Sequence, residues 1–220
     1  MKLFIANKNY SSWSLRPWSL MRELAIPFSE QLMEFGTGYR SFSPSGRVPC
    51  LHDGDTVVWD SLAIAEYLAE RHPGVWPADA KARAWARCAA AEMHAGFTTL
   101  RDRCSMNCGV RVRLRDMPDA LARDVARIGE LWTEGLTRFG GPFLAGSAFT
   151  AVDGYFTPVA FRVQTYGLQL PDAAAAYAKR LLALPSLKAW YAAALAEPWR
   201  DAGHEDEITA TGTVLEDLRT

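Results

Sequence analysis

The feature that most constrains the fold is a change of pattern at residues 72–77, HPGVWP, where two prolines and a glycine fall within six residues. Prolines and glycine at this density mark a break between elements. Before the break, runs with strand spacing and helix spacing alternate, whereas after it the strong patterns are all helical. We therefore predict two domains, a small α/β domain at residues 1–76 and an all-helical domain at residues 77–220.

The α/β domain is predicted from four short patterns. An apolar strand at Lys2–Ala6 runs into an amphipathic helix, and residues 28–35 form a plausible second strand. Two short β-rich runs flank the turn Asp53-Gly54-Asp55, and such an arrangement is a strong hairpin signal. A helix then opens at Asp60-Ser61. The predicted order is β-α-β-loop-β-β-α.

The second domain is predicted to be helical throughout. Thr150 to Asp153 resembles a capping box, with Asp in place of the usual Glu or Gln, and Pro158 should kink the helix that it opens. The tail after Pro198 is polar and acidic, and we assign it no regular structure. The predicted helical segments are residues 79–103, 118–139, the segment opened by the capping box, 172–184 and 186–196.

Composition excludes several classes of partner. A net charge of −1 gives no reason to expect nucleic acid or an anionic membrane surface. No apolar run approaches the roughly 18 residues that a membrane span requires. The N-terminus has no signal-peptide pattern, and the four cysteines show neither disulfide spacing nor a complete metal site. We expect a reduced, cytoplasmic protein without a metal ion.

The junction between the first strand and the first helix carries adjacent serines, Ser11 and Ser12. Serine is favoured at a helix start because its oxygen accepts from an unpaired backbone N–H. The same helix end favours a bound anion, since its exposed N–H groups carry partial positive charge. A hydroxyl here can therefore cap the helix or donate to an anion.

Three segments together carry a family resemblance: NYSSWSLRPW at 9–18, SPSGRVPCL at 43–51 and WDSLAIAEYLAERHP at 59–73. They resemble the N-terminal half of cytosolic glutathione transferases, most closely serine-type bacterial members and the zeta class. The resemblance implies a thioredoxin-like domain followed by an all-α domain, with glutathione as co-substrate. It also implies a homodimer and a role in detoxification.

The resemblance implies that the Ser11 hydroxyl donates a hydrogen bond to the thiolate of glutathione. Ser12 is the alternative donor, and Tyr10 is a more distant one. The thiol of free glutathione has a pKa of about 8.5. Lowering this pKa by two units requires that the thiolate be stabilised by about 2.7 kcal/mol. A helix N-terminus supplies roughly 0.3–2 kcal/mol, and a hydroxyl bonded to the anion roughly 1.5–3 kcal/mol. The two contributions together suffice.

The other two segments would bind the rest of the glutathione molecule. The resemblance implies a cis peptide bond before Pro49, which would turn the Val48 backbone toward the cysteinyl part of glutathione. Arg47 would reach a carboxylate, although a solvated loop charge is the alternative. Asp60 and Ser61 match the pair that holds the γ-glutamyl end, and a plain helix cap is compatible with the same residues.

The electrophile site is expected between the domains. Met93, His94, Phe97 and Arg101 lie at helical spacing and are the candidates, although a histidine such as His94 is more often structural than catalytic. The basic stretch from Arg101 to Arg115 could attract an acidic substrate, but a solvated, ion-paired face is the simpler interpretation.

Trp13 stands where the zeta-class pattern has a cysteine, which puts the maleylacetoacetate isomerase activity of that class in doubt and makes the pocket mouth more apolar. We therefore predict transfer of glutathione to an electrophile, with Trp13 at the site. The alternatives are a glutathione-dependent isomerase of a small diacid and a non-catalytic binding or scaffold protein with the same fold.

Overall fold

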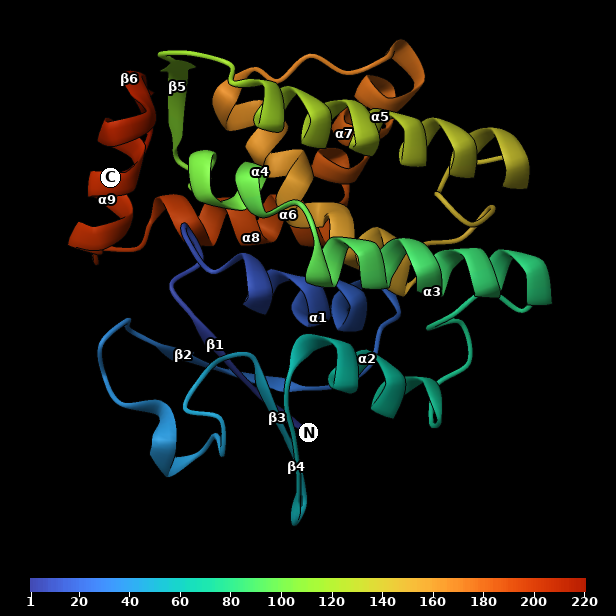
Figure 1. Cartoon of the computed structure of the whole chain (residues 1–220). Helices are drawn as coiled ribbons and strands as arrows, with labels where there is room; N and C mark the ends of the chain where they lie inside the picture. Colours follow the sequence, from blue (N-terminus) through green and yellow to red (C-terminus); the bar gives the residue numbers. More distant parts are fainter.

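The computed structural model describes residues 1–220. Figure 1 shows a small sheet with α1 and α2 in one half of the molecule and a group of helices in the other. The helices are α1 (Ser12–Glu23), α2 (Ser61–Ala69), α3 (Ala80–Ala95), α4 (Thr98–Arg103), α5 (Asp119–Phe139), α6 (Ala151–Tyr166), α7 (Asp172–Ala183), α8 (Pro185–Leu195) and α9 (Ala202–Thr211), with a 3₁₀ turn at Tyr39–Ser41. The strands are β1 (Lys2–Ala6), β2 (Ser29–Met33), β3 (Cys50–Asp53), β4 (Thr56–Val58), β5 (Val110–Leu114) and β6 (Gly212–Asp217).

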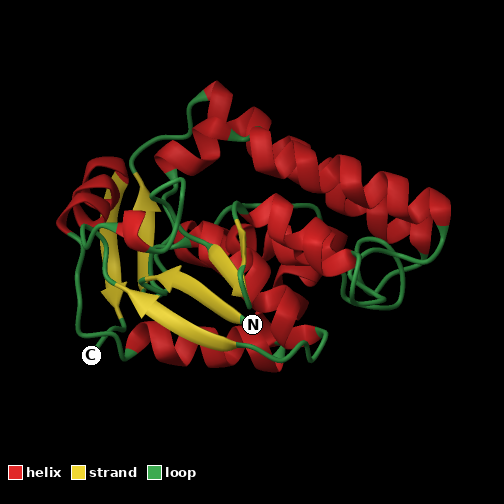
Figure 2. Ribbon diagram, turned by 90° about the horizontal axis from the view of Figure 1, so that it is seen from below, coloured by secondary structure: helices red, strands yellow, loops and turns green.

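The four N-terminal strands form one mixed sheet in the order β2-β1-β3-β4 (Figure 2). β1 pairs in parallel with β2 and antiparallel with β3, which continues into β4 through the hairpin. Gly54 has a φ of 57° in that turn, a conformation that glycine adopts without strain. The predicted α/β order of the first 76 residues is confirmed, including the hairpin.

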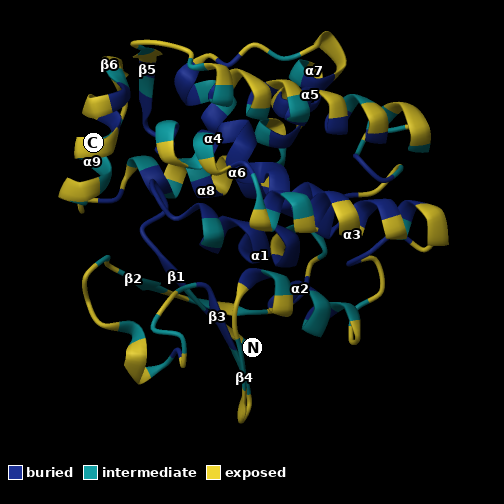
Figure 3. Ribbon diagram, viewed as in Figure 1, coloured by how far each residue is buried: buried dark blue, intermediate teal, exposed yellow.

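The helical half is built around α6, which is the most deeply buried helix (Figure 3). The predicted capping box is present: Thr150 and Asp153 each accept a hydrogen bond from the other's backbone. α1 packs directly against α6, so the two halves share one continuous apolar core. This contact fixes the loop before α1 relative to the helices.

The helix predicted over residues 79–103 is wrong in one respect, because it is two helices. α3 ends at Ala95 and α4 begins at Thr98, with Phe97 between them at a φ of 54°. Gly96 lies at the break, where a residue without a Cβ fits, since a Cβ on it would lie 2.8 Å from the carbonyl oxygen of Glu92.

The prediction that the tail after Pro198 has no regular structure is also wrong. It forms α9 and β6, and β6 pairs antiparallel with β5 about a hundred residues earlier. β5 itself lies in the basic stretch that we interpreted as a solvated face. A strand that obtains its partner from so far away leaves no local hairpin signal. No helix of the structure is both long enough and apolar enough to cross a membrane.

Candidate functional site

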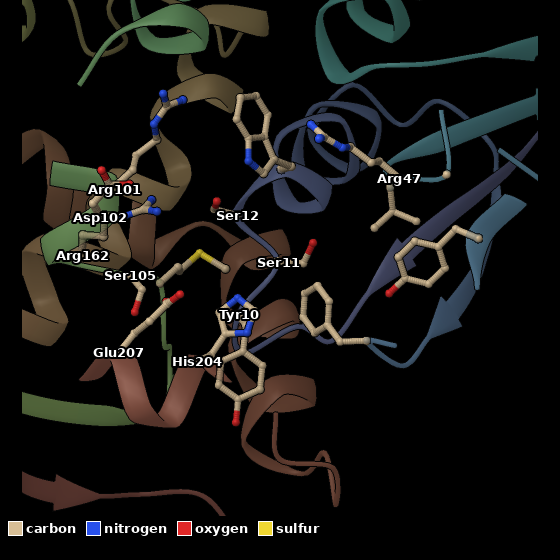
Figure 4. A pocket seen from close by; sticks show the side chains of 16 residues that line it. Tyr10, Ser11, Ser12, Arg47, Arg101, Asp102, Ser105, Arg162, His204 and Glu207 are labelled. Atoms are coloured by element: carbon tan, nitrogen blue, oxygen red, sulfur yellow. The ribbon is translucent and has the colours of Figure 1, made fainter. Parts of the chain in front are cut away.

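A cleft of about 430 Å³ lies where the sheet half meets the helical half. The loop before α1 forms its floor, and the loop before β3 forms one wall (Figure 4). The opposite wall comes from α4, the segment that follows it, α6 and α9. The cleft therefore collects side chains from both ends and the middle of the sequence.

Ser11 and Ser12 both line this cleft at the start of α1. Ser11 occupies the N-cap position but makes no side-chain cap, and its Oγ instead donates to Ser14 Oγ at 2.7 Å. Ser14 Oγ also accepts from the Ala6 N–H at 3.1 Å. In Figure 4 the Ser11 hydroxyl points toward the Arg47 side of the cleft and the Ser12 hydroxyl toward Arg101. The hydroxyls of the two serines therefore face different parts of the same cleft.

The first turn of α1 keeps the donors that an anion needs. The backbone N–H groups of Trp13 and Ser14 donate to no protein acceptor, while those of Ser11 and Ser12 are used within the preceding turn. Unpaired N–H groups at a helix start carry the positive end of the helix dipole. The helix end and the Ser11 hydroxyl are therefore both available to one negative group.

The hydroxyl of Tyr10, the more distant alternative for a hydrogen bond to the thiolate, is already bonded to other residues. Its hydroxyl donates to Glu205 Oε1 at 2.6 Å and accepts from Arg219 at 3.2 Å. Burial, followed by the hydrogen bond to Glu205, raises the pKa of Tyr10 well above its ordinary value. This hydroxyl fastens the C-terminal segment rather than serving the cleft.

The second segment of the resemblance forms a smaller adjoining pocket. Arg47 and Val48 line both the cleft and this pocket, and Pro49 lines the pocket. The Val48-Pro49 peptide bond is cis, as the resemblance implied. Arg47 is exposed and forms no ion pair, so its guanidinium is available to a carboxylate.

Asp60 lines the same small pocket as the N-cap of α2, where its Oδ1 accepts from the Leu62 N–H at 2.9 Å. Its Oδ2 lies 3.4 Å from His94 Nε2. Ser61, the next residue, is only 1% exposed and its hydroxyl has no hydrogen-bond partner. The cap that we considered as the alternative role for this pair is real, but only Asp60 provides it.

The four electrophile-site candidates on the helical half separate. Arg101 lines the cleft, and its Nη1 donates to the His94 carbonyl at 3.1 Å. Met93 is fully buried in the core and Phe97 is 7% exposed, and neither lines the cleft. The reason is the break between α3 and α4, which turns the face carrying these two side chains into the core. His94 packs edge-on against Trp13 at 5.2 Å, behind the cleft wall, and burial lowers its pKa.

Trp13 separates the cleft from the smaller pocket and lines both. Its ring lies 4.0 Å from the Arg16 guanidinium on the buried side and 5.4 Å from that of Arg101, which lines the cleft. A cation over an indole ring is attracted to its negative face. The indole is therefore held in place as a shared wall.

Sequence reasoning missed several side chains of the helical wall. They come from four separate elements, and no local motif marks them. His204 and Glu207 lie on α9, in the tail that the sequence pattern predicts to have no regular structure. The missed wall residues are Asp102, Ser105, Met106, Arg162, His204 and Glu207.

Arg162 gives this wall a buried positive charge. Its Nε donates to the Cys104 carbonyl at 2.7 Å, and no carboxylate is paired with it. Burial lowers its pKa to about 10, so the guanidinium remains charged at neutral pH. Together with Arg101 it makes part of the wall cationic, although the carboxylates of Asp102 and Glu207 also line the cleft. No group of three or more His, Cys, Asp or Glu side chains is arranged to hold a metal ion.

Comparison with known proteins agrees with this geometry. Residues 10–71, which contain the serines, the cis-proline loop and the start of α2, match the family described as "Glutathione S-transferase, N-terminal domain". Residues 10–71 therefore form a domain of this family, and the chain as a whole has the glutathione transferase fold. The helical half lies outside that match, and its assignment rests on whole-chain similarity.

Two whole-chain similarities support the glutathione transferase fold. Glutathione S-transferase 3 of Zea mays is 26% identical over 205 residues, covering 84% of this chain and 85% of that protein. A bacterial zeta-class maleylpyruvate isomerase superposes with a TM-score of 0.68 at 21% identity, covering 91% of this chain and all of the other. At that identity the structural likeness shows the fold alone.

A third similarity is local. The dichloromethane dehalogenase of Methylorubrum extorquens is 36% identical over 61 residues, which are 24% of this chain and only 21% of that protein. In this match the chain spans about a fifth of the relative's length. The shared part therefore says nothing of how the rest of either protein selects a substrate.

Proposed function

We propose that this glutathione transferase superfamily member binds glutathione and uses it, as the thiolate, to attack an electrophilic carbon of a small molecule. The observation that carries the proposal is the arrangement at the start of α1. The Ser11 hydroxyl and two unpaired N–H groups lie at the floor of a cleft, and the wall formed by the loop before β3 offers Arg47 and the Val48 backbone. Neighbouring structures of the same fold have been solved with bound glutathione, among them a homolog from Burkholderia.

In the proposed reaction the thiol proton leaves to solvent and the Ser11 hydroxyl donates to the resulting thiolate. The thiolate sulfur then forms a bond to the electrophilic carbon, and the leaving group departs with the electron pair of the broken bond. Ser11 can turn its proton from Ser14 toward the sulfur, since Ser14 can donate its own proton to Ser11 in exchange. Ser14 Oγ would still accept from the Ala6 N–H, so the pair acts as a short hydroxyl relay.

The experiment is a titration of the thiolate absorbance of bound glutathione across pH, with wild type, Ser11→Ala and Ser12→Ala. We expect the thiol pKa to fall well below about 8.5 in wild type and in Ser12→Ala, and to return toward that value in Ser11→Ala. If the thiol pKa returns toward that value only in Ser12→Ala, Ser12 is the residue that donates to the thiolate. Glutathione binding without a thiolate signal in any variant would favour a binding or scaffold protein instead.

A second candidate is a glutathione-dependent isomerase of a small diacid, which is favoured by the two cationic side chains of the helical wall. Arg101 and Arg162 are bonded to carbonyl oxygens rather than carboxylates, and both can face a substrate carboxylate. In that reaction the thiolate adds to the carbon–carbon double bond, rotation follows, and the same sulfur leaves. Turnover of a chloroaromatic would support the transferase, and cis–trans conversion of a maleyl diacid would support the isomerase.

The proposal extends to a homodimer in the cytoplasm, both of which rest on the family resemblance. All four cysteines are free, which is compatible with a reducing compartment. Light scattering of the purified chain measures the oligomeric state directly, and a monomer at micromolar concentration would remove the dimer from the proposal.

A further inference from the structure

Behind Trp13 lies a group of four side chains with buried polar atoms that lack hydrogen-bond partners. Arg16 is 1% exposed, and its Nε, Nη1 and Nη2 all bond to nothing. Ser61 Oγ and the Tyr155 hydroxyl adjoin each other but make no hydrogen bond of good geometry, and His94 Nδ1, on a side chain that is 23% exposed, is also unpaired. Buried polar atoms are paired in the great majority of cases, so four unpaired groups in one place require an explanation.

These side chains come from four helices and meet at one point. The Arg16 guanidinium lies 4.0 Å from the ring of Trp13 and 5.1 Å from that of Tyr155. The rings of Tyr155 and His94 lie 6.4 Å apart, and His94 Nε2 is 3.4 Å from Asp60 Oδ2. Trp13 and Asp60 both line the small pocket beside the cleft. The group therefore lies directly behind the wall of that pocket.

The charge in this region is unbalanced. Burial lowers the pKa of Arg16 to about 9, which leaves the guanidinium charged at neutral pH. Repulsion by Arg162 and Arg101 lowers the pKa of Arg16 further, and the Asp60 carboxylate opposes that effect. Asp60 is itself half exposed and adjoins His94. A buried, unpaired cation is costly, so the site favours a bound anion.

Glutathione carries such an anion next to a cation. Its γ-glutamyl end bears a carboxylate and an ammonium on one carbon, and under the proposed function Asp60 and Ser61 hold that end. The Asp60 carboxylate suits the ammonium, and the free Ser61 hydroxyl suits the carboxylate. Tyr155 faces both the Ser61 hydroxyl and Arg16, so it connects them.

We propose that Arg16 is the buried counter-charge for the γ-glutamyl carboxylate of glutathione, acting through Tyr155 and the Ser61 hydroxyl. This inference rests on the proposed function and adds a positioning residue to it. Arg16 does not touch the ligand, since Trp13 covers it. The charge of Arg16 favours a peptide whose γ-linked residue carries a carboxylate on the same carbon as its ammonium group.

The test compares two peptides by calorimetry: glutathione and 4-aminobutyryl-cysteinyl-glycine, which differs only in lacking the γ-glutamyl carboxylate. The quantity measured is the ratio of the two dissociation constants. We expect wild type to prefer glutathione at least about tenfold, as one charge interaction in a partly screened site allows. Arg16→Met should remove most of that preference, and Arg16→Lys should retain most of it.

Arg22→Met is the matched control, because Arg22 lies on the same helix against the rings of Trp18 and Phe28 but is partly exposed. We expect it to leave the preference unchanged. Tyr155→Phe is a second variant that keeps the packing, and it should lower the preference about threefold. It carries the test by itself if Arg16→Met does not fold.

Three outcomes would contradict the inference. If Arg16→Met weakens both peptides equally, Arg16 serves the fold and not the carboxylate. If the preference survives in both Arg16→Met and Tyr155→Phe, the carboxylate is held elsewhere. If wild type binds neither peptide, the proposed function fails and this inference fails with it.

Discussion

Asp153 and Arg16 are both fully buried charged side chains, and they lie on the two helices that pack against each other, α6 and α1. Asp153 accepts four hydrogen bonds: from the N–H groups of Leu144 and Thr150 and from the hydroxyls of Thr150 and Tyr177. Arg16 makes none. A buried charge whose bonds are complete belongs to the fold, whereas one whose bonds are missing is available to a ligand.

The largest expected effect follows from removing the satisfied charge. Asp153→Ala leaves four buried donors unpaired, and we expect the free energy of unfolding to fall by about 3–5 kcal/mol. Urea unfolding measures this change. Asp172→Ala is the control, since Asp172 lies in the first turn of α7 but is exposed, and it should cost less than about 1 kcal/mol. Equal losses in the two variants would mean that the bonds of Asp153 contribute little.

A smaller effect concerns pH. Burial raises the pKa of Asp153 from 3.8 to about 6, although its hydrogen bonds oppose the shift. The folded state therefore holds a proton that the unfolded state has lost, and this group's contribution to stability is full below about pH 4 and is lost as the pH rises through 6. A shift of this size corresponds to about 3 kcal/mol at most.

The measurement is the difference in unfolding free energy between wild type and Asp153→Asn from pH 3.5 to 7. We expect that difference to shrink as the pH rises, because the amide does not titrate. Other carboxylates, such as Glu30 with its lowered pKa, titrate in both proteins and cancel. A difference that is flat with pH would show that Asp153 keeps an ordinary pKa.

The smallest expected effect on stability is at the unsatisfied charge. Arg16→Met removes an unpaired guanidinium and loses its contacts with two aromatic rings, so we expect stability to stay constant or to rise by up to about 2 kcal/mol. Thermal unfolding without glutathione measures it. A loss as large as that of Asp153→Ala would abolish the contrast between the two residues.

Asp153 and Arg16 also show what can be predicted from the sequence alone. The capping box was found because Thr150 and Asp153 are three residues apart, so that their bonds form within one helical turn. The burial of Arg16 depends on α6, more than 130 residues later, crossing α1 at Gly154, where a Cβ would lie 3.1 Å from the Arg16 carbonyl oxygen. No pattern within α1 records that crossing.

The candidate site divides in the same way. Ser11, Arg47 and Asp60 were predicted from short local segments, and all three line the cleft or the pocket beside it. Arg162 and His204 were missed because their positions in the cleft depend on the packing of α6 and α9. Met93 and Phe97 were placed at the site by helical spacing, which fails where α3 ends.

The loop that carries Ser11 is held in place in large part by residues near the far end of the chain. The Lys8 N–H donates to both oxygens of Glu197, the Lys8 carbonyl accepts from Trp190 Nε1, and the Asn9 side chain donates to the Ala194 carbonyl. These contacts close loops of more than 180 residues, which are formed late when a chain folds. The sheet can assemble early from local pairings, but the serine would reach its final position only after α8 has docked. A growing or cleaved chain that lacks α8 would therefore contain every residue of the glutathione motifs without the geometry to use them.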